Sequence, residues 1–349
     1  MDADVPQRLR VRDRVVKGKT PAFRAVILAG GSGERFWPLS TPERPKQFLR
    51  VFGGESLIRQ AVSRLKGIAR AKDVFVVTSA KLAAATRREL PELPAANVVG
   101  EPDRRDTAAA VALGVGAAAP AAAKGDPVVG FFPSDQMVTA PERFRAVVRR
   151  AAAVAARSQA VVVVGIRPSC PSTSFGYINP KTGAFFEKPS VRRARAYLKQ
   201  GYLWNAGMFI ARASVFRKLF AKHAPDLCVL ADGVPAPAAL RRVYAALPRI
   251  SFDFAVMEKA ERIRVVPGDF GWDDVGSYGA FDRYFPHDRR GNVREGPCTV
   301  VDSEGNICVA RSARISLLGV KNLVVVTTPD SVLVADKSRV AEMKKLFSR

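Results

Sequence analysis

The sequence has few of the residues that build metal sites and nucleophilic catalysts. Only two histidines and four cysteines occur among 349 residues, and the cysteines form no CxxC pair. His223 and His287 have no acidic or cysteine-rich surroundings, which argues against a zinc site and against Ser-His-Asp catalysis. The cysteines lie far apart at Cys170, Cys228, Cys298 and Cys308. This scatter fits a reducing compartment better than a disulfide framework, so we expect a cytoplasmic protein with idle thiols.

Long apolar runs are also absent. Residues 1–22 alternate in charge without the apolar stretch of a signal peptide, so we expect a disordered basic tail. The stretch from Thr107 to Ala123 is mostly alanine, and Gly114, Gly116 and Pro120 interrupt it. It is too weakly hydrophobic for a membrane span and is interpreted as a buried helix. No membrane association is therefore expected.

Acidic residues are outnumbered, with 32 against 56 lysines and arginines, and the formal charge is +24. Such an imbalance can attract nucleic acid, anionic lipid or phosphorylated small molecules. The basic residues are spread along the chain, and the sequence contains neither an aromatic RNA-binding motif nor a helix-turn-helix. Most of the charge is therefore interpreted as solvated surface, and no nucleic-acid partner is expected.

Apolar runs bounded by turn residues alternate with helix-like stretches up to about residue 287. The expected strands are Ala25–Ala29, Val74–Thr78, Val128–Phe132 and Val161–Ile166. The expected helices are Leu57–Leu65, Leu82–Glu89, Thr107–Ala119, Pro141–Ala156 and Val191–Lys199. This alternation predicts an α/β domain over residues 23–287, with a mostly parallel sheet flanked by helices. Ligands of such sheets bind beyond the carboxyl ends of the strands.

Short strands and turns replace this pattern over residues 288–349, which predicts a small β-rich C-terminal domain. Leu323–Val326 and Val332–Val334 flank Thr328-Pro329-Asp330, so they are expected to form a hairpin. A short helix from Ser338 to Phe347 closes the domain. No strict repeat is visible, although regularly spaced strands can build a few coils of a solenoid.

The first expected strand runs into a glycine-rich turn formed by Gly30, Gly31 and Gly33. Such a turn offers unobstructed backbone N–H groups to phosphate oxygens. The residues that follow fit neither the Walker loop nor the dinucleotide fingerprint. Instead, Arg35 and Lys46 can neutralise a polyphosphate, and a leaving diphosphate would gain from prepositioned cations. On the glycines alone, an ordinary turn with two surface cations is an equal alternative.

The whole signature is longer and resembles a known family. "LAGGSGERFWPLS" at residues 28–40 and "PKQF" at residues 45–48 are similar to the signature of sugar-1-phosphate nucleotidyltransferases, and their details look like mannose-1-phosphate guanylyltransferases. The resemblance covers roughly residues 24–347. It implies a Rossmann-like nucleotidyltransferase fold with a β-helix-like C-terminal domain. The nucleotide-binding residues it implies are Leu28, Ala29, Gly30, Gly31, Gly33, Arg35, Lys46, Thr107 and Asp135.

Two segments with acidic residues fit a metal site. Asp135 follows an apolar strand in "FFPSDQMV", where a carboxylate could meet a nucleotide phosphate through Mg²⁺, although a capping or turn aspartate is the alternative. Asp273 and Asp274 lie in "GDFGWDDVGSY". The resemblance implies that Mg²⁺ is held by Asp135 and Asp274 and that Asp273 is structural. Gln136 replaces a histidine of the family pattern.

The sugar side of the cleft is assigned by the same resemblance. Glu187 is expected to bind sugar hydroxyls and Lys188 the sugar phosphate, while Gly176 lets the backbone approach the sugar. Asn205 can donate to and accept from hydroxyls, and Asp253 could touch the same region.

Other nearby residues depart from the pattern or are interpreted as structural. Trp204 and Met208 are expected in the core, and Glu258 and Lys259 on an ordinary helix surface. Near the base, Asp106 stands for asparagine and Ala109 for proline, so guanine contacts there are left open.

The resulting hypothesis is an enzyme that converts GTP and mannose 1-phosphate to GDP-mannose and diphosphate. Catalysis is assigned to Arg35 on the β- and γ-phosphates, Lys46 near the reacting phosphates and Lys188 on the sugar phosphate. The alternatives are a sister transferase with another base or sugar, a catalytically silent nucleotide-sugar sensor, and a basic nucleic-acid-binding module. A homodimer is compatible with the sequence. Because no cupin-like domain follows in this sequence, a bifunctional transferase-isomerase is not expected.

Overall fold

The computed structural model describes residues 21–31 and 33–347. The expected basic tail lies almost wholly outside the described residues, as does Ser32 in the glycine turn.

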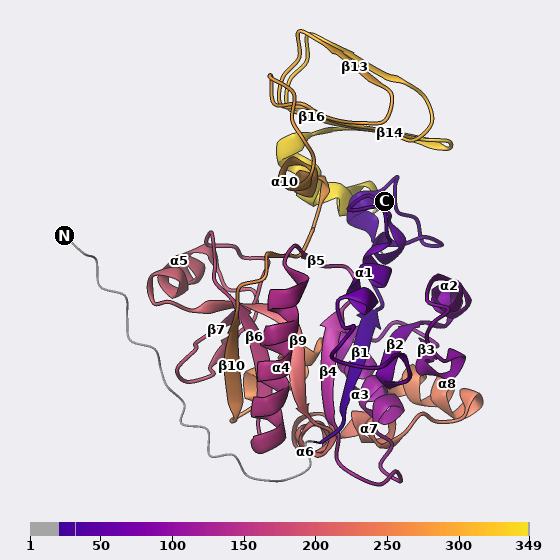
Figure 1. Cartoon of the computed structure of the whole chain (residues 1–349), viewed down its shortest axis with the longest axis vertical. Coiled ribbons are helices and arrows are strands. Elements are labelled where there is room, and N and C mark those ends of the chain that lie inside the picture. The colour runs from indigo at the N-terminus through magenta and orange to yellow at the C-terminus, as the bar shows by residue number, and fades with distance from the viewer. Residues whose placement is uncertain (1–20, 32, 348–349) are drawn as a thin grey trace, which may run out of the picture.

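A large mixed sheet forms the centre of the molecule, in the strand order β10-β6-β9-β4-β1-β2-β3 (Figure 1). Its strands are β1 Phe23–Ala29, β2 Val74–Ser79, β3 Val98–Glu101, β4 Val128–Pro133, β6 Val161–Ile166, β9 Leu203–Arg212 and β10 Ile263–Gly268. Two short strands, β7 Tyr177–Ile178 and β8 Phe185–Phe186, extend it beside β9. All four strands expected from the sequence are present, so the α/β prediction is confirmed.

Among the seven strands of this order, β9 is the exception to the parallel arrangement, because it runs antiparallel to both β4 and β6. Its last residue, Arg212, pairs with Val128 at the start of β4. The first residues of β9 therefore lie at the edge where the parallel strands end. That edge collects the end of β1, the end of β4 and the start of β9, and it is where parallel α/β sheets bind ligands.

Helices cover both faces of the sheet. They are α1 Leu57–Ser63, α2 Ala83–Glu89, α3 Asp106–Ala118, α4 Pro141–Arg157, α5 Val191–Lys199, α6 Ala213–His223, α7 Cys228–Asp232, α8 Pro237–Ala246, α9 Phe252–Ala255 and α10 Phe281–Tyr284. The five expected helices are confirmed to within a few residues. The side chains of Ser56 and Ser190 cap α1 and α5, and Pro141 begins α4.

Each face of the sheet has its own apolar core. In β1, Val26 packs into the core with α3 and α6, while Ala25 and Ile27 pack into the opposite core with α1 and α4. This follows from the alternation of side chains along a strand. The alanine-rich α3 is almost entirely buried, as the sequence predicted.

The C-terminal module, residues 293–347, forms short coils above the carboxyl edge of the sheet (Figure 1). Its strands are β12 Val293–Glu295, β13 Cys298–Val301, β14 Ile307–Ala310, β15 Ile315–Leu318, β16 Leu323–Thr328 and β17 Ser331–Asp336. β12, β14 and β16 stack in parallel on one side, and β13 and β15 on another. The predicted hairpin is confirmed, because β16 and β17 pair antiparallel.

Two buried asparagines hold the coils in register. Asn306 donates from Nδ2 to Asn292 Oδ1 at 2.9 Å, and its own Oδ1 accepts from the backbone N–H of Leu323 at 2.9 Å. Each asparagine thus satisfies the backbone of an adjacent coil at a corner where no strand ladder exists.

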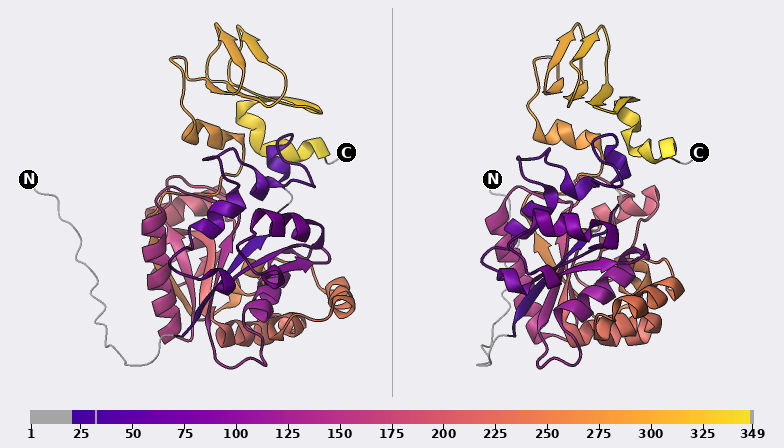
Figure 2. Two further views of the ribbon diagram at one scale, coloured as in Figure 1. Left: turned by 45° about the vertical axis from the view of Figure 1, so that its right-hand side comes forward. Right: turned by 90° about the vertical axis from the view of Figure 1, so that its right-hand side faces the viewer.

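A third core joins the module to the glycine turn. Phe36, Leu49 and Phe52 from the segment after β1 pack with Val309 and Met343 of the module. The 3-10 helix η9, Lys337–Phe347, closes the chain where the sequence predicted a short helix, and it lies beside residues 34–36 (Figure 2).

No helix in the described part of the chain is both long and apolar enough to cross a bilayer. The four cysteines are all free thiols.

Candidate active site

The glycine turn follows β1 at the carboxyl edge of the sheet. Gly33 has φ of +71°, and a Cβ atom there would lie 2.4 Å from the backbone nitrogen of Lys46. Only glycine therefore lets the turn and the lysine segment come this close. The turn leads into a single 3-10 turn, η1 Glu34–Phe36, so no α-helix N-terminus follows it.

Backbone oxygens at the end of β1 hold the segments that surround the site. Leu28 O accepts from the backbone N–H of Ser134 at 3.0 Å. Ala29 O accepts from Gln47 Nε2 and from Thr78 Oγ1, both at 3.0 Å. These bonds explain why a glutamine follows Lys46, a point that the sequence analysis did not address. The backbone oxygens of Leu28 and Ala29 thus fix the end of β1. The N–H groups available to a ligand are those of the glycine turn beyond it.

Lys46 brings the two predicted metal-binding acids together. Its side chain is almost fully buried, and Nζ lies 3.0 Å from Asp135 Oδ2 and 2.7 Å from the backbone oxygen of Asp274. An ammonium group has three protons, so a third N–H is left to donate to a substrate. The ring of Phe36, 5.9 Å away, adds a cation-π contact.

Around this lysine lies a cavity of about 240 Å³. Its lining consists of Gly31, Gly33, Glu34, Arg35, Lys46, Gln47, Asp135, Asp274, Gly276 and Lys344. The structure therefore brings together both cations, both acids and two of the three glycines that the sequence analysis selected for the phosphates; Gly30 does not line the cavity. It also adds four residues that the sequence analysis did not select: Glu34, Gln47, Gly276 and Lys344.

The two adjacent aspartates differ in their surroundings. Burial raises the pKa of Asp274, Lys46 opposes the rise and Asp135 adds to it. Asp273 instead binds Arg283 through both carboxylate oxygens and accepts from Tyr284 Oη at 3.1 Å. Asp273 is thus occupied by structural contacts, whereas Asp274 lines the cavity.

Gln136 fills the position of the family's histidine with a structural role. Its Nε2 donates to Ala206 O at 2.9 Å, and its Oε1 accepts from Trp272 Nε1 at 2.9 Å. Its backbone oxygen accepts from Arg64, a buried cation whose pKa burial lowers to about 10. The departure from the pattern therefore leaves the loop that carries Asp135 firmly tied to β9.

The expected sugar-binding residues form a second cluster at the same edge. A Cβ atom on Gly176 would lie 2.5 Å from Glu187 Oε2, so a larger residue there would displace the Glu187 carboxylate. Glu187 pairs with Lys188 at 3.1 Å, and Asn205 donates its backbone N–H to Gly176 O at 2.8 Å. Lys188 has φ of +42°, an unfavourable backbone conformation of the kind that gathers at ligand sites.

Asp253 belongs to this cluster, as the sequence analysis allowed. Its Oδ1 accepts from Asn205 Nδ2 at 3.0 Å. Burial raises its pKa to about 7, and the nearby charge of Glu187 adds to the rise. Sequence reasoning missed the role of Glu258. Its side chain accepts from the backbone N–H of Glu187 at 2.9 Å and so holds in place the acid that is expected to bind the sugar.

Thr107 stands apart from the phosphate cavity. Its Oγ1 accepts from the backbone N–H of Phe252 at 2.8 Å, which ties α3 to α9 and gives Thr107 a structural role.

Asp106, at the start of α3, raises the pKa of both Asp253 and Glu101, and Ala109 is buried in the core. Glu101 was not selected from the sequence, yet burial raises its pKa to about 7 and it lies next to Gly30.

The donor set suits a hard cation better than zinc. Within residues 21–31 and 33–347, no group of three or more histidine, cysteine, aspartate or glutamate side chains is arranged to hold a metal. Asp135 and Asp274 supply two carboxylates beside the glycine turn. Mg²⁺ is commonly held by one or two carboxylates, with substrate phosphates and water as its other ligands.

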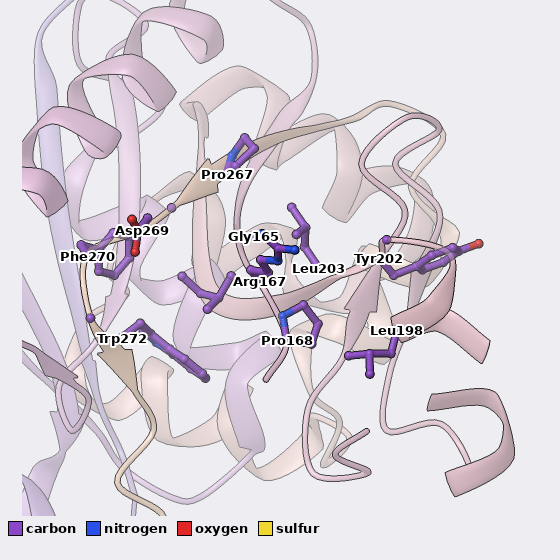
Figure 3. Close-up of a pocket in the computed structure, with 14 residues that line it drawn as sticks. Gly165, Arg167, Pro168, Leu198, Tyr202, Leu203, Pro267, Asp269, Phe270 and Trp272 are labelled. Carbon is purple, nitrogen blue, oxygen red and sulfur yellow. The ribbon is translucent and has the colours of Figure 1, made fainter. Parts of the chain in front are cut away.

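A larger cavity of about 940 Å³ opens nearby, at the ends of β6 and β10 (Figure 3). Trp272 lies on one side of it, with Tyr202 and Leu198 on the other. None of the site residues selected from the sequence lines it. The charged groups that suit phosphate chemistry converge on the smaller cavity, which is therefore the candidate active site.

Comparisons with known proteins point to the same chemistry. The family described as nucleotidyl transferase matches residues 24–290, and the family described as MannoseP isomerase/GMP-like beta-helix domain matches residues 296–349. The mannose-1-phosphate guanylyltransferase of Escherichia coli K12 is 34% identical, over 93% of this chain and 72% of its own length. The xanthan biosynthesis protein XanB of Xanthomonas campestris pv. campestris is 36% identical over the same shares.

A solved structure is similar throughout. The crystal structure titled mannose-1-phosphate geranyltransferase, from Thermus thermophilus, is 36% identical and superposes with a TM-score of 0.84. The match covers 94% of this chain and 98% of that one.

The glycine turn provides a matched pair of substitutions. Gly33→Ala should lower the free energy of unfolding by about 1–3 kcal/mol and weaken triphosphate binding, because the new methyl group meets the Lys46 backbone. Gly31→Ala has no atom within 4 Å of its Cβ, so its stability should change by less than about 0.5 kcal/mol. Urea denaturation measures the stability of both variants. Equal stability of the two variants would contradict the close approach.

Asp253→Asn should change how stability depends on pH. The folded carboxyl keeps its proton up to about pH 7, whereas an unfolded aspartate loses it near pH 4 (about 3.9), so the folded state binds more protons in between. The unfolding free energy of the parent therefore falls as pH rises through this window. Asp253→Asn lacks this loss, so between pH 5 and pH 8 its free energy of unfolding should rise by about 1–3 kcal/mol relative to that of the parent. Denaturation curves across that range test this, and a constant difference would rule it out.

Proposed function

The chain belongs to the nucleotidyl transferase family, and we propose that it is a mannose-1-phosphate guanylyltransferase that converts GTP and α-D-mannose 1-phosphate to GDP-mannose and diphosphate. Relatives of that name match it at about a third identity over most of its length. The observation that carries the proposal is the phosphate cavity, where the glycine turn, Arg35, Lys46, Asp135 and Asp274 meet.

The reaction is a single displacement. An oxygen of the sugar phosphate attacks the α-phosphorus of GTP, a new P–O bond forms, and the bond from the α-phosphorus to the bridging β-oxygen breaks. Its electron pair leaves with diphosphate. No covalent intermediate with the enzyme is needed, so the residues act by positioning the reactants and stabilising charge.

The cations lie where that charge develops. The glycine turn offers its N–H groups to the triphosphate, and Arg35 reaches the β- and γ-phosphates from an exposed position. Lys46 keeps two of its donors on Asp135 and Asp274 and directs the third at the reacting phosphates. Because this ammonium is buried and held from two sides, it needs no reorganisation as the bond breaks.

Asp135 and Asp274 are the residues that would hold a divalent cation, proposed as Mg²⁺, which when bound supplies positive charge to the phosphate oxygens of both substrates. Their carboxylates come from different segments, because Asp135 follows β4 and Asp274 follows the short strand β11, Trp272–Asp273. The raised pKa of Asp274 reflects burial beside a second acid, a situation that a cation relieves.

The sugar cluster orients the second substrate. Glu187 accepts hydrogen bonds from sugar hydroxyls, and Lys188, whose side chain is largely exposed, binds the sugar phosphate. The side chain of Asn205 hydrogen-bonds to Asp253 and to the backbone of Gly207. The backbone hydrogen bond from Asn205 to Gly176 joins β9 to the start of β7. The bond from Gln136 to Ala206 connects this cluster to Asp135, so both substrates are positioned by one linked framework.

Diphosphate release tests the function. The purified protein should release diphosphate with GTP, mannose 1-phosphate and Mg²⁺, at a higher kcat/KM than with ATP, UTP or dTTP, or with glucose 1-phosphate. Faster turnover with another base or sugar would identify a sister transferase. Binding of GTP without product from any pair would identify a silent sensor instead.

Asp274→Asn should lower kcat by about 100-fold or more, since it removes one of the two carboxylates that would hold the divalent cation at the point of transfer. The KM for mannose 1-phosphate should change less than kcat, because Glu187, Lys188 and Asn205 remain in place to bind that substrate. Asp273→Asn is the matched control: it removes the contacts to Arg283 and Tyr284, so it should cost stability while turnover is retained. Steady-state kinetics and thermal unfolding separate the two, and unchanged turnover in Asp274→Asn would remove that residue from the mechanism.

A further inference from the structure

The last helix of the C-terminal module reaches the phosphate cavity. Val340 and Met343 of η9 are buried in the third core with Phe36, which belongs to the turn after the glycines. The ring of Phe347 contacts Trp37 with centroids 5.9 Å apart. These anchors lie on both sides of Lys344 in the sequence, so the backbone position of Lys344 relative to the glycine turn is set by packing.

Lys344 lines the same cavity as Arg35, Lys46, Asp135 and Asp274. Its neighbour Lys345 does not line the cavity and forms an ion pair with Glu342 on the same helix. These two adjacent, exposed lysines of η9 therefore have different surroundings. One faces the phosphate site, and the other belongs to the helix surface.

The charge of the cavity lining shows what Lys344 adds. Three carboxylates, from Glu34, Asp135 and Asp274, face three cations, from Arg35, Lys46 and Lys344. Lys46 is already engaged by Asp135, so without Lys344 the lining would be net negative with Arg35 as its other cation. A triphosphate carries about four negative charges, so a third side-chain cation favours its binding beside the proposed divalent ion.

We propose that Lys344 is a substrate-binding residue that contacts the β- and γ-phosphates of the nucleotide and the departing diphosphate. This inference rests on the proposed function, and it makes the C-terminal module a part of the active site. Lysine suits the task because its ammonium is a compact charge on a flexible stem, which can follow the diphosphate as it separates. The contribution is greatest for the ligand with the most concentrated negative charge, which is diphosphate.

The test compares Lys344→Ala, Lys344→Arg and Lys345→Ala in the full chain. Lys344→Ala should raise the KM for GTP, and for diphosphate in the reverse reaction, about tenfold, equivalent to about 1.4 kcal/mol. The KM for mannose 1-phosphate should stay within about twofold of the parent, a factor worth less than about 0.5 kcal/mol. Lys344→Arg should recover most of the loss, and Lys345→Ala should resemble the parent. Thermal unfolding should be unchanged in all three, because both lysine side chains are exposed.

Calorimetric titration with diphosphate and Mg²⁺ gives a readout that does not depend on turnover. Lys344→Ala should bind diphosphate about tenfold more weakly than the parent, again about 1.4 kcal/mol. Equal losses in Lys344→Ala and Lys345→Ala would show a general effect of surface charge and overturn the proposal. So would a loss that accompanies a lower melting temperature and is not recovered by arginine. Failure of the proposed function would be seen separately, as the absence of GDP-mannose formation by the parent protein.

Discussion

The candidate site depends on one buried ammonium group. Lys46 binds the carboxylate of Asp135 and the backbone oxygen of Asp274, which come from segments more than a hundred residues apart. Without that cation, two acids in a small cavity would repel each other and their desolvation would be uncompensated. The requirement that Lys46 approach this closely in turn explains Gly33, since any side chain there would meet the lysine backbone.

The direction of β9 places the sugar residues beside the phosphate residues. In an all-parallel sheet the start of this strand would lie at the opposite edge from the end of β4. Because β9 is antiparallel, Asn205 lies near the end of β4, and Gln136 bonds to Ala206 one residue further on. A single reversal of strand direction thus brings the two clusters to one edge without a long loop.

Helices and strands with a regular apolar pattern, and segments of unusual composition, could be predicted from the sequence, as β1, α3 and α4 illustrate. The roles of Gln136 and Glu258 could not, because each depends on a partner at least 70 residues away. The recurrence of asparagine before an apolar residue, at Asn292, Asn306 and Asn322, was a readable sign of the coils. Its meaning emerges only once Asn306 is seen to bond both the coil before it and the coil after it.

The C-terminal module supplies rigidity that the glycine turn lacks. Phosphate loops are commonly held by the α-helix that follows them, but here only the three-residue turn η1 follows. Its backbone is held instead by Tyr278, whose hydroxyl donates toward the oxygens of Phe36 and Trp37, and by the third core beneath it. Because that core includes side chains of the module, loosening the module would loosen the turn. The coils therefore contribute to phosphate binding through packing as well as through the residues that reach the cavity.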